Sequence, residues 1–375
     1  MSATANSLNG DLPIPAISAS QSAGSMSLRI VRGPLEPVQC EAILSQYNQL
    51  TSSQIPLSEF RHWVEGTPDG PAWHALLENS DSQIVGHSAV IPLGGHFGAG
   101  RLVAGKVEYA FIKEDYKTAV IRGFEDSGRL RNAIMIHQLL LRCGAEGLGP
   151  FFISTSAPRQ RMLPAVGCTN VKFPLTECLL VLQPLQAARA TPNVKNWQRA
   201  MLAGSGFFQA SLWSAARFLV PGQKKILRRP ISRVSLAAKK DRLSFFNDPR
   251  SFEWRYLDGQ YACLELGENS EQYVVVKNGG EDRYARVCQW RLSGGQPDLA
   301  LLGRLVSLAK QQQALGVRWA VYGGDRKAQE MVSRLRKAGF VCAARTRALL
   351  IHTTDQRFHA PESWDLTDAL FSFDP

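Results

Sequence analysis

Apolar positions recur along the chain in two long stretches, and each stretch predicts strands and helices in the same order. In the first stretch, the apolar runs predict strands at 83–91, 102–112, 151–154 and 175–182. Glycines within 94–100 predict a hairpin turn between the first two strands, and Asn132 is expected to cap a helix before the third. In the second stretch, strands are predicted at 261–266, 273–277, 285–292, 318–322 and 341–352, with helices at 299–314 and around 332–335.

The matching order of elements favours a tandem duplication, although the two stretches share almost no residue identity. A period of about 170 residues fits one α+β unit used twice. We therefore predict an α+β protein with two tandem domains, each a mixed, mostly antiparallel sheet flanked by helices. The expected division is a disordered tail at 1–27, a first domain at 28–190, a basic linker at 191–244 and a second domain at 245–375.

Composition agrees with a globular chain, and its excess positive charge is local. The chain has 375 residues, 45% of them hydrophobic, and a formal net charge of +11, a length that fits two domains. Between Lys195 and Arg242, eleven basic residues stand against one acid, Asp241. The remainder of the chain is therefore close to neutral, and the basic character belongs to the linker.

The linker allows two interpretations. Apolar residues of 197–219 share one face of a predicted helix, with basic residues opposite. Such a helix could lie on an anionic membrane surface or bind another acidic partner through 195–242, or it could pack on one domain with its basic side in water. Arg217 and nearby polar residues argue against a transmembrane span. Nucleic-acid binding is disfavoured, because no nucleic-acid module surrounds the segment.

Cysteine usage and the remaining motifs exclude several classes of site. The seven cysteines lack the short-spaced couples of a zinc site and mostly stand in apolar surroundings, which favours buried free thiols and no metal. Residues 1–27 lack the charged and apolar regions of a signal peptide, so we expect a cytoplasmic protein. Phosphate loops, dinucleotide fingerprints and nucleophile elbows are also missing.

The order of elements resembles that of the GNAT acyltransferases. The pieces that carry the resemblance are 84–90, 107–112, 147–150, 165–168 and 336–340. The closing segment 363–367 resembles the tail of tandem GNAT-like proteins that are often associated with bacterial polysaccharide clusters. The resemblance implies transfer of an acyl group from acetyl-coenzyme A, or another acyl-coenzyme A, to an amine or hydroxyl of a small molecule such as a sugar.

The resemblance also implies where the donor lies. It would run along the strand at 107–113, in contact with Phe111, Ile112 and Lys113. Its phosphates would sit at the start of the following helix, where the helix dipole favours an anion. The residues expected there are Arg122, Arg129, Arg131 and Asn132.

Two carboxylates and two hydroxyls complete the predicted site. Glu108 on the donor strand is the first candidate base for the acceptor. Glu177 stands in an apolar strand and is the second if it faces the cleft, although alternation could point it to solvent. Ser154 and Ser156 follow the buried strand and are candidates to hydrogen-bond the substrate.

Departures from the family pattern leave two alternatives open. The expected Arg/Gln-x-x-Gly-x-Gly/Ala loop is replaced by a longer segment, 118–129, and the usual acid Tyr is replaced by Leu163 and Leu335. The chain could be a GNAT-fold binding module that has lost coenzyme A. It could instead be a Fem-type aminoacyl transferase that uses charged tRNA, with 195–242 as the RNA contact.

Overall fold

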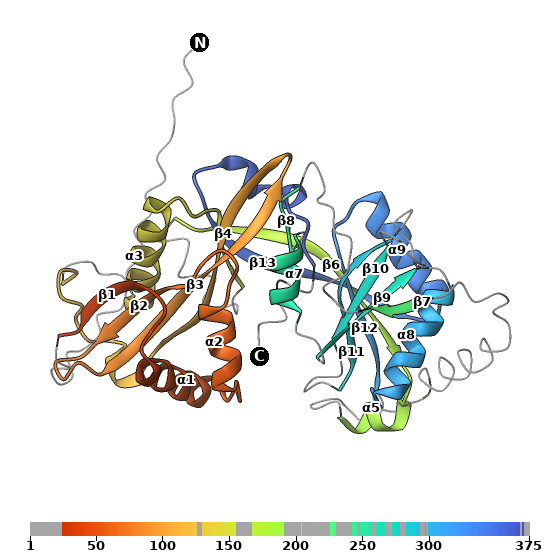
Figure 1. Ribbon diagram of the computed structural model, residues 1–375, viewed down its shortest axis with the longest axis horizontal. Coiled ribbons are helices and arrows are strands. Elements are labelled where there is room, and N and C mark those ends of the chain that lie inside the picture. Colours follow the sequence, from red (N-terminus) through yellow and green to blue (C-terminus); the bar gives the residue numbers. More distant parts are fainter. Residues whose placement is uncertain are drawn as a thin grey trace, which may run out of the picture.

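A computed structural model of the chain describes 25–125, 130–154, 167–190, 204, 226–229, 242–246, 248–256, 260–266, 272–277, 283–292, 297, 299–367 and 370. Its helices and strands form two lobes that are joined by long strands (Figure 1). Apart from Gly204, the predicted linker helix lies outside the described residues, as does the tail at 1–24.

The first lobe is an antiparallel meander followed by one parallel strand. Its strands are β1 (Ser27–Arg32), β2 (Trp73–Glu78), β3 (Ile84–Phe97), β4 (Gly100–Ile112) and β5 (Phe151–Ser154). Neighbours from β1 to β4 pair antiparallel, and β4 pairs with β5 in parallel. Helices α1 (Pro37–Thr51) and α2 (Leu57–Glu65) pack on one side of this sheet, and α3 (Arg131–Ala145) packs on the other.

The second lobe repeats this plan. Its strands are β7 (Ile226–Arg229), β9 (Tyr261–Leu266), β10 (Tyr273–Lys277), β11 (Ala285–Arg291) and β12 (Gly316–Tyr322), and β11 pairs with β12 in parallel. Its helices are α5 (Pro184–Ala190), α7 (Pro249–Arg255), α8 (Leu299–Gln311) and α9 (Arg326–Lys337). Short pieces, η1 (Glu114–Tyr116), β8 (Ser244–Phe245), η5 (Gln356–His359) and η6 (Pro361–Ser363), complete the described elements.

The last strand of each half crosses to the other half. Strand β6 (Thr169–Val181), from the first half, pairs with β12, while β13 (Val341–His352), from the second half, pairs with β5. The two exchanged strands also pair with each other over eleven residue positions. The described strands therefore form one continuous sheet in the order β1-β2-β3-β4-β5-β13-β6-β12-β11-β10-β9-β7, where a separate sheet in each domain was expected.

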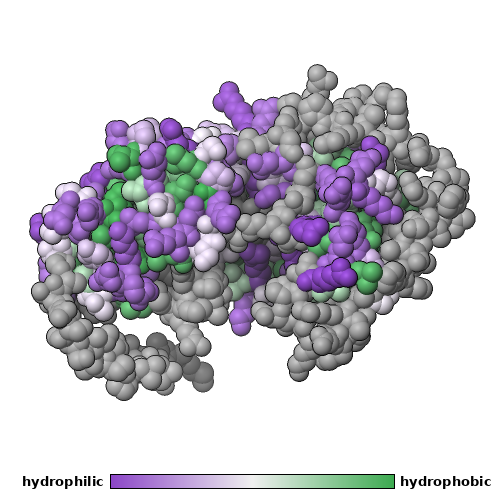
Figure 2. Space-filling model, turned by 90° about the horizontal axis from the view of Figure 1, so that it is seen from below, coloured by the Kyte–Doolittle hydropathy of each residue, from purple (hydrophilic) through white to green (hydrophobic). Residues whose placement is uncertain are grey.

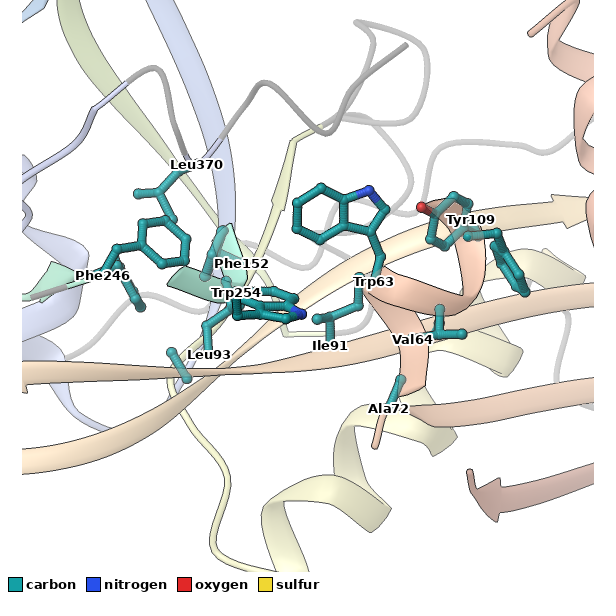
Figure 3. Packing of buried hydrophobic residues seen from close by; sticks show 14 of the residues in the cluster. Trp63, Val64, Ala72, Ile91, Leu93, Tyr109, Phe152, Phe246, Trp254 and Leu370 are labelled. Atoms are coloured by element: carbon teal, nitrogen blue, oxygen red, sulfur yellow. The ribbon is translucent and has the colours of Figure 1, made fainter. Parts of the chain in front are cut away.

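A shared hydrophobic core joins the lobes below this sheet. One cluster of buried residues runs from α1 and α2 to α7, β9 and β10, and Figure 3 shows Trp63 of α2 beside Trp254 of α7 in it. The two rings meet edge to face, with centroids 5.1 Å apart. Across the same contact, His62 Nε2 lies 2.8 Å from the Trp254 carbonyl, and the Trp254 indole donates to the His62 carbonyl at 3.2 Å. The lobes are thus packed together as well as linked by strands.

Most strand predictions are confirmed, and the exceptions have local causes. Gly94 and Gly95, expected in the hairpin turn, lie inside β3. These glycines serve close packing there and not a turn, because a side chain at Gly94 would strike the Asp69 carboxylate and one at Gly95 would strike Leu243. Asn132 is not the cap of α3: the cap is Leu130, so the helix starts at Arg131, two residues earlier than expected. The predicted tail reaches too far, because Met26 is fully buried and the first strand begins at 27.

The cysteines depart from the sequence expectation at one pair. The register of β6 and β13 places Cys178 opposite Cys342, and the two form a disulfide. Sequence spacing could not indicate this pair, because 164 positions separate its members. The other five cysteines are free and buried, as predicted, and burial raises the pKa of the Cys143 and Cys168 thiols to about 12.

The surface of the described residues is mixed. On the face in Figure 2, hydrophobic residues of the first lobe are interspersed with hydrophilic ones. Among the described residues, no helix has both the length and the apolar character needed to span a membrane.

Candidate functional site

The parallel strands β4 and β5 separate soon after they meet. They pair at Gly105 with Phe151 and at Lys106 with Phe152. Strand β4 then continues for six residues, whereas β5 ends two residues later, at Ser154. Gly105 is required at the point of contact, because a Cβ there would lie 2.4 Å from Phe151 Cδ1. The two strands thus form the sides of a V that opens beyond the paired residues.

Four polar side chains project from one face of the sheet at this V, and we call them the V cluster: Lys106, Glu108, Ser154 and Arg347. Residues two apart on a strand share a face. Lys106 is opposite Phe152, so Glu108 and Ser154 face the same side. Leu349 of β13 is opposite Ser154, which adds Arg347 to that side.

One contact of the V cluster lies within β4, and another joins the two halves of the chain. The ammonium of Lys106 is fully buried and forms an ion pair with the Glu108 carboxylate, whose side chain is 13% exposed. The Arg347 guanidinium donates to Ser154 Oγ at 3.2 Å. A carboxylate, a hydroxyl and two cations are therefore gathered on three neighbouring strands, and the guanidinium comes from the exchanged strand β13.

A bulge in β4 directly follows Glu108. The pairing of β3 with β4 shifts between His87 and Ala89, and Tyr109 takes a left-handed conformation with φ of 53°. Few residues other than glycine adopt this conformation. The Tyr109 ring is fixed by edge-to-face contacts with Tyr47 and Phe60, at centroid distances of 5.2 and 4.9 Å.

The predicted donor residues beyond the bulge turn mostly into the core. The side chains of Phe111 and Ile112 are each 4% exposed, so a ligand in the V could reach them mainly through their backbone. Lys113 is half-buried, and its backbone N–H donates to Val85 at 2.9 Å.

The start of α3 brings together some of the predicted phosphate residues. Arg131 is half-buried and donates through Nε to the Ala119 carbonyl at 2.5 Å. Asn132 stands in the first turn, and its buried Oδ1 has no hydrogen-bond partner among the described residues. Arg122 is exposed. The cap residue of α3 makes no side-chain hydrogen bond, and its first turn holds no acid, so the electropositive end of the helix is not neutralised locally.

Three other predicted positions lie apart from this site or outside the described residues. Glu177 is exposed on β6, with its carboxylate 3.6 Å from Arg345 Nε, and β5 and β13 lie between its strand and that of Glu108. The exposed position agrees with the alternative that alternation points it to solvent. Arg129 and Ser156 lie outside the described residues.

Sequence reasoning missed two members of the V cluster. Lys106 could have been found, because it stands two positions before Glu108 and must share its face of a strand. Arg347 carried no such signal. Its contact with Ser154 spans 193 positions and depends on the exchange of the last strands.

The second lobe has a V of the same construction with different chemistry. Strands β11 and β12 pair at 285–287 with 317–319. Counted from the first parallel pair of each lobe, Glu108 and Tyr109 correspond to Cys288 and Gln289. Gln289 is buried and hydrogen-bonded to two tyrosines: it accepts from Tyr256 at 2.7 Å and donates to Tyr273 at 3.1 Å. The guanidinium of the fully buried Arg255 lies 5.3 Å from the centroid of the Tyr256 ring. Burial raises the pKa of both tyrosines above the usual value.

Potential metal ligands do not cluster in threes in the described part of the chain. It contains no group of three or more His, Cys, Asp or Glu side chains that could hold a metal ion. Two such side chains of the first lobe do lie side by side, the buried pair His74 and His87, with ring nitrogens 3.0 Å apart.

Comparisons with known proteins find similarity to solved structures and to no sequence family. No family model and no curated protein sequence matches the chain. A conserved protein of unknown function from Enterococcus faecalis, described as a probable N-acyltransferase, is 11% identical and aligns over 86% of this chain and 71% of its own, with a TM-score of 0.52. A putative acetyltransferase from Pyrococcus horikoshii aligns over 94% and 95%, at 11% identity and a TM-score of 0.49. A GCN5-related N-acetyltransferase from Anabaena variabilis aligns over 86% and 72%, at 13% identity and a TM-score of 0.47.

The chain therefore has a GNAT-like α+β fold, as the order of its elements predicts. The similarity to the Enterococcus structure extends over both lobes. At this level of identity it shows the fold alone.

Proposed function

We propose that the protein is an acyltransferase that moves an acyl group from an acyl-coenzyme A, such as acetyl-coenzyme A, to an amine or hydroxyl of a small molecule. The observation that carries the proposal is the charged V cluster at the separating strands β4 and β5. The proposal treats the two lobes as a tandem pair of GNAT-like units and assigns the reaction to the first.

The donor would lie along β4 beyond Lys106, where that strand has parted from β5. Its phosphates would lie toward the start of α3, whose dipole favours an anion. Arg122 and Arg131 border this end, and Arg129 is the third predicted contact. Asn132, in the first turn of α3, would donate to a phosphate oxygen through its amide Nδ2.

The reaction needs a base for the acceptor and a proton for the departing thiolate. The acceptor nitrogen or oxygen attacks the thioester carbon, the C–S bond breaks, and the acceptor proton passes to the base. The coenzyme A thiolate then takes up a proton. Glu108 is favoured as the base over Glu177, because it lies at the V and is largely shielded from solvent, whereas Glu177 is exposed on another strand.

Ser154 and Arg347 would bind the acceptor opposite Glu108. Ser154 Oγ offers a hydrogen bond, and the guanidinium that holds it carries a positive charge to the same face. The basic segment 195–242 would bind an acidic partner such as an anionic membrane surface.

The first experiment is a calorimetric titration of the full chain with acetyl-coenzyme A and with free coenzyme A, followed by an acceptor screen. We expect micromolar binding of the donor, unchanged in Glu108→Gln, and turnover reduced about 100-fold or more in that variant. Glu177→Gln is the matched control and should keep full turnover. Wild-type protein that binds neither ligand would refute the enzyme and support the binding-module alternative. Retention of labelled tRNA by the wild type would favour the Fem-type alternative.

A further inference from the structure

Two buried histidines stand directly behind the β4 bulge. His74 of β2 and His87 of β3 are both completely buried, and Nδ1 of His74 lies 3.0 Å from Nε2 of His87. The other ring nitrogen of His87, Nδ1, lies 3.0 Å from the backbone carbonyl of Tyr109. A line of hydrogen bonds therefore runs from β2 through β3 to the left-handed residue of β4.

The chemistry of the three groups fixes the direction of each hydrogen bond. A carbonyl oxygen can only accept, so Nδ1 of His87 must carry the proton and donate it. In a neutral imidazole the second nitrogen is then an acceptor, so Nε2 of His87 accepts from Nδ1–H of His74. His74 is left with a bare Nε2, which has no hydrogen-bond partner among the described residues.

Both rings are held in the neutral form that this arrangement needs. Burial lowers the pKa of His87 to about 4, and it lowers the pKa of His74 well below the usual value, with the neighbouring His87 as a second cause. The backbone of Gly33 passes close to the unprotonated nitrogen of His74: a Cβ at Gly33 would lie 3.3 Å from Nε2 of His74.

The carbonyl that His87 holds belongs to the residue that gives β4 its bulge. A peptide unit is planar, so a fixed Tyr109 carbonyl also fixes the orientation of the following N–H. Glu108 immediately precedes this residue, and the proposed donor strand follows it. A shift of the bulge would therefore move the candidate base and the donor backbone relative to each other.

We propose that His87, whose ring is hydrogen-bonded on one side to the Tyr109 carbonyl and on the other to His74, is a positioning residue for the acyl transfer: it fixes the Tyr109 carbonyl and thereby the β4 bulge between Glu108 and the proposed donor contacts at 111–113. This inference rests on the proposed function. His87 would touch neither donor nor acceptor, and its effect on the reaction would pass through the backbone of Tyr109.

A matched pair of substitutions separates this role from simple filling of the core. In His87→Gln, the amide can donate to the Tyr109 carbonyl and accept from His74, so both hydrogen bonds are retained. In His87→Leu, the volume is similar, and both are lost. We expect His87→Leu to lower kcat about 10- to 100-fold, the loss expected from a small misplacement of reacting groups, with little change in the KM of the acceptor. His87→Gln should stay within about threefold of the wild type.

The effect of His87 on the β4 bulge can be measured even if the protein shows no turnover. Long-range 1H–15N NMR spectra of the full chain at neutral pH should show both rings protonated on Nδ1, and hydrogen exchange in 105–112 should be faster in His87→Leu than in His87→Gln. If the wild type neither binds acyl-coenzyme A nor turns over, the proposed function fails. Correct tautomers and faster exchange in the Leu variant alone would still support the role of His87 in fixing the bulge.

Three results would overturn the inference. They are an Nε2-protonated His87, equal kcat values in folded Leu and Gln variants, and equal exchange rates in those two variants. If His87→Leu fails to fold, His74→Leu replaces it as the test, because it keeps the bond to Tyr109 and removes only the hydrogen bond that His74 donates to Nε2 of His87. That variant should keep His87 protonated on Nδ1, show faster hydrogen exchange in 105–112 than the wild type, and show a smaller loss of kcat than His87→Leu is expected to cause; unchanged exchange and unchanged kcat would contradict the proposal.

Discussion

The two lobes share one plan of strands, and they differ in what their separating strands present. At the first V, a buried ammonium, a carboxylate, a hydroxyl and a guanidinium face the same side. At the second V, Gln289 is enclosed by two tyrosine hydroxyls, and a cysteine stands where the first lobe has Glu108. The first V combines a carboxylate with two cations, whereas the second has a neutral amide and two tyrosines beside the buried Arg255. Because the proposed reaction needs a general base, the carboxylate favours the first lobe for it.

The disulfide between the exchanged strands should give the largest effect on stability. Cys178–Cys342 closes a loop of 164 positions and links the two halves covalently. Chain entropy alone predicts a loss of about 5 kcal/mol in the free energy of unfolding when such a link is removed. Denaturant unfolding of Cys342→Ser beside the wild type measures this loss.

The control for this prediction is the double variant Cys178→Ser/Cys342→Ser, whose midpoint should not respond to a reducing agent. A wild type that is equally insensitive, and that shows seven titratable thiols after denaturation under non-reducing conditions, would contradict the link.

Acid should destabilise the first lobe before the second. Both buried histidines have a folded-state pKa below the ordinary value of 6.5, with His87 at about 4. The unfolded chain therefore binds more protons than the folded chain between these pH values, so stability is full above 6.5 and falls as the pH drops. For His87 alone the loss by pH 4 is roughly 3 kcal/mol.

Hydrogen exchange measured by mass spectrometry from pH 7 to pH 4 tests the acid prediction lobe by lobe. Peptides of β2, β3 and β4 should lose protection before those of β9, β10 and β11. Replacing both histidines with Gln should reduce the difference. Simultaneous loss in both lobes of the wild type would show that the histidine pair does not govern acid unfolding.

A smaller loss of stability is expected from substitutions at the residues where the two parallel strand pairs begin. Gly105 starts the first pair and Ala285 the second. An added methyl at Gly105 would overlap Phe151 and Val90, so Gly105→Ala should cost about 1–3 kcal/mol and alter the opening of the V. Ala285→Gly should cost only about 1 kcal/mol, from one buried methyl and added chain freedom. Thermal unfolding of the two variants, with donor binding in parallel, checks the asymmetry; equal losses would mean that the two junctions are packed alike.

Local patterns predicted the strands of this fold better than they predicted its connections. The last strand was expected at 341–352, and β13 has these bounds, because two apolar runs, 341–344 and 348–351, lie between a helix end and a turn and carry a strong signal. The same pattern holds no information on which half that strand joins. Its pairing with β5 and β6 depends on contacts across more than 160 positions, so the disulfide and the contribution of Arg347 stayed hidden.

The site could be predicted in part for a similar reason. Glu108 and Ser154 were found because each is a polar residue at a recognisable place on a strand. The Tyr109 bulge and the histidine pair behind it were missed, because left-handed backbone at a tyrosine has no sequence signature. The role of His87 becomes visible only when β2, β3 and β4 lie side by side.

The smallest expected effect concerns the carboxylate outside the V. Glu177 and Arg345 are 47% and 64% exposed and 3.6 Å apart, and such surface pairs contribute about 0–1 kcal/mol. Glu177→Gln should therefore change neither the unfolding midpoint nor turnover by a measurable amount. The two glutamates differ in this respect because of their strands: β4 turns Glu108 toward a buried ammonium at the V, and β6 turns Glu177 toward solvent between two alanines of its neighbours. If Glu177→Gln abolished turnover while Glu108→Gln did not, the reaction would have to be assigned to the surface around β6, and the contrast between the two lobes would lose its functional meaning.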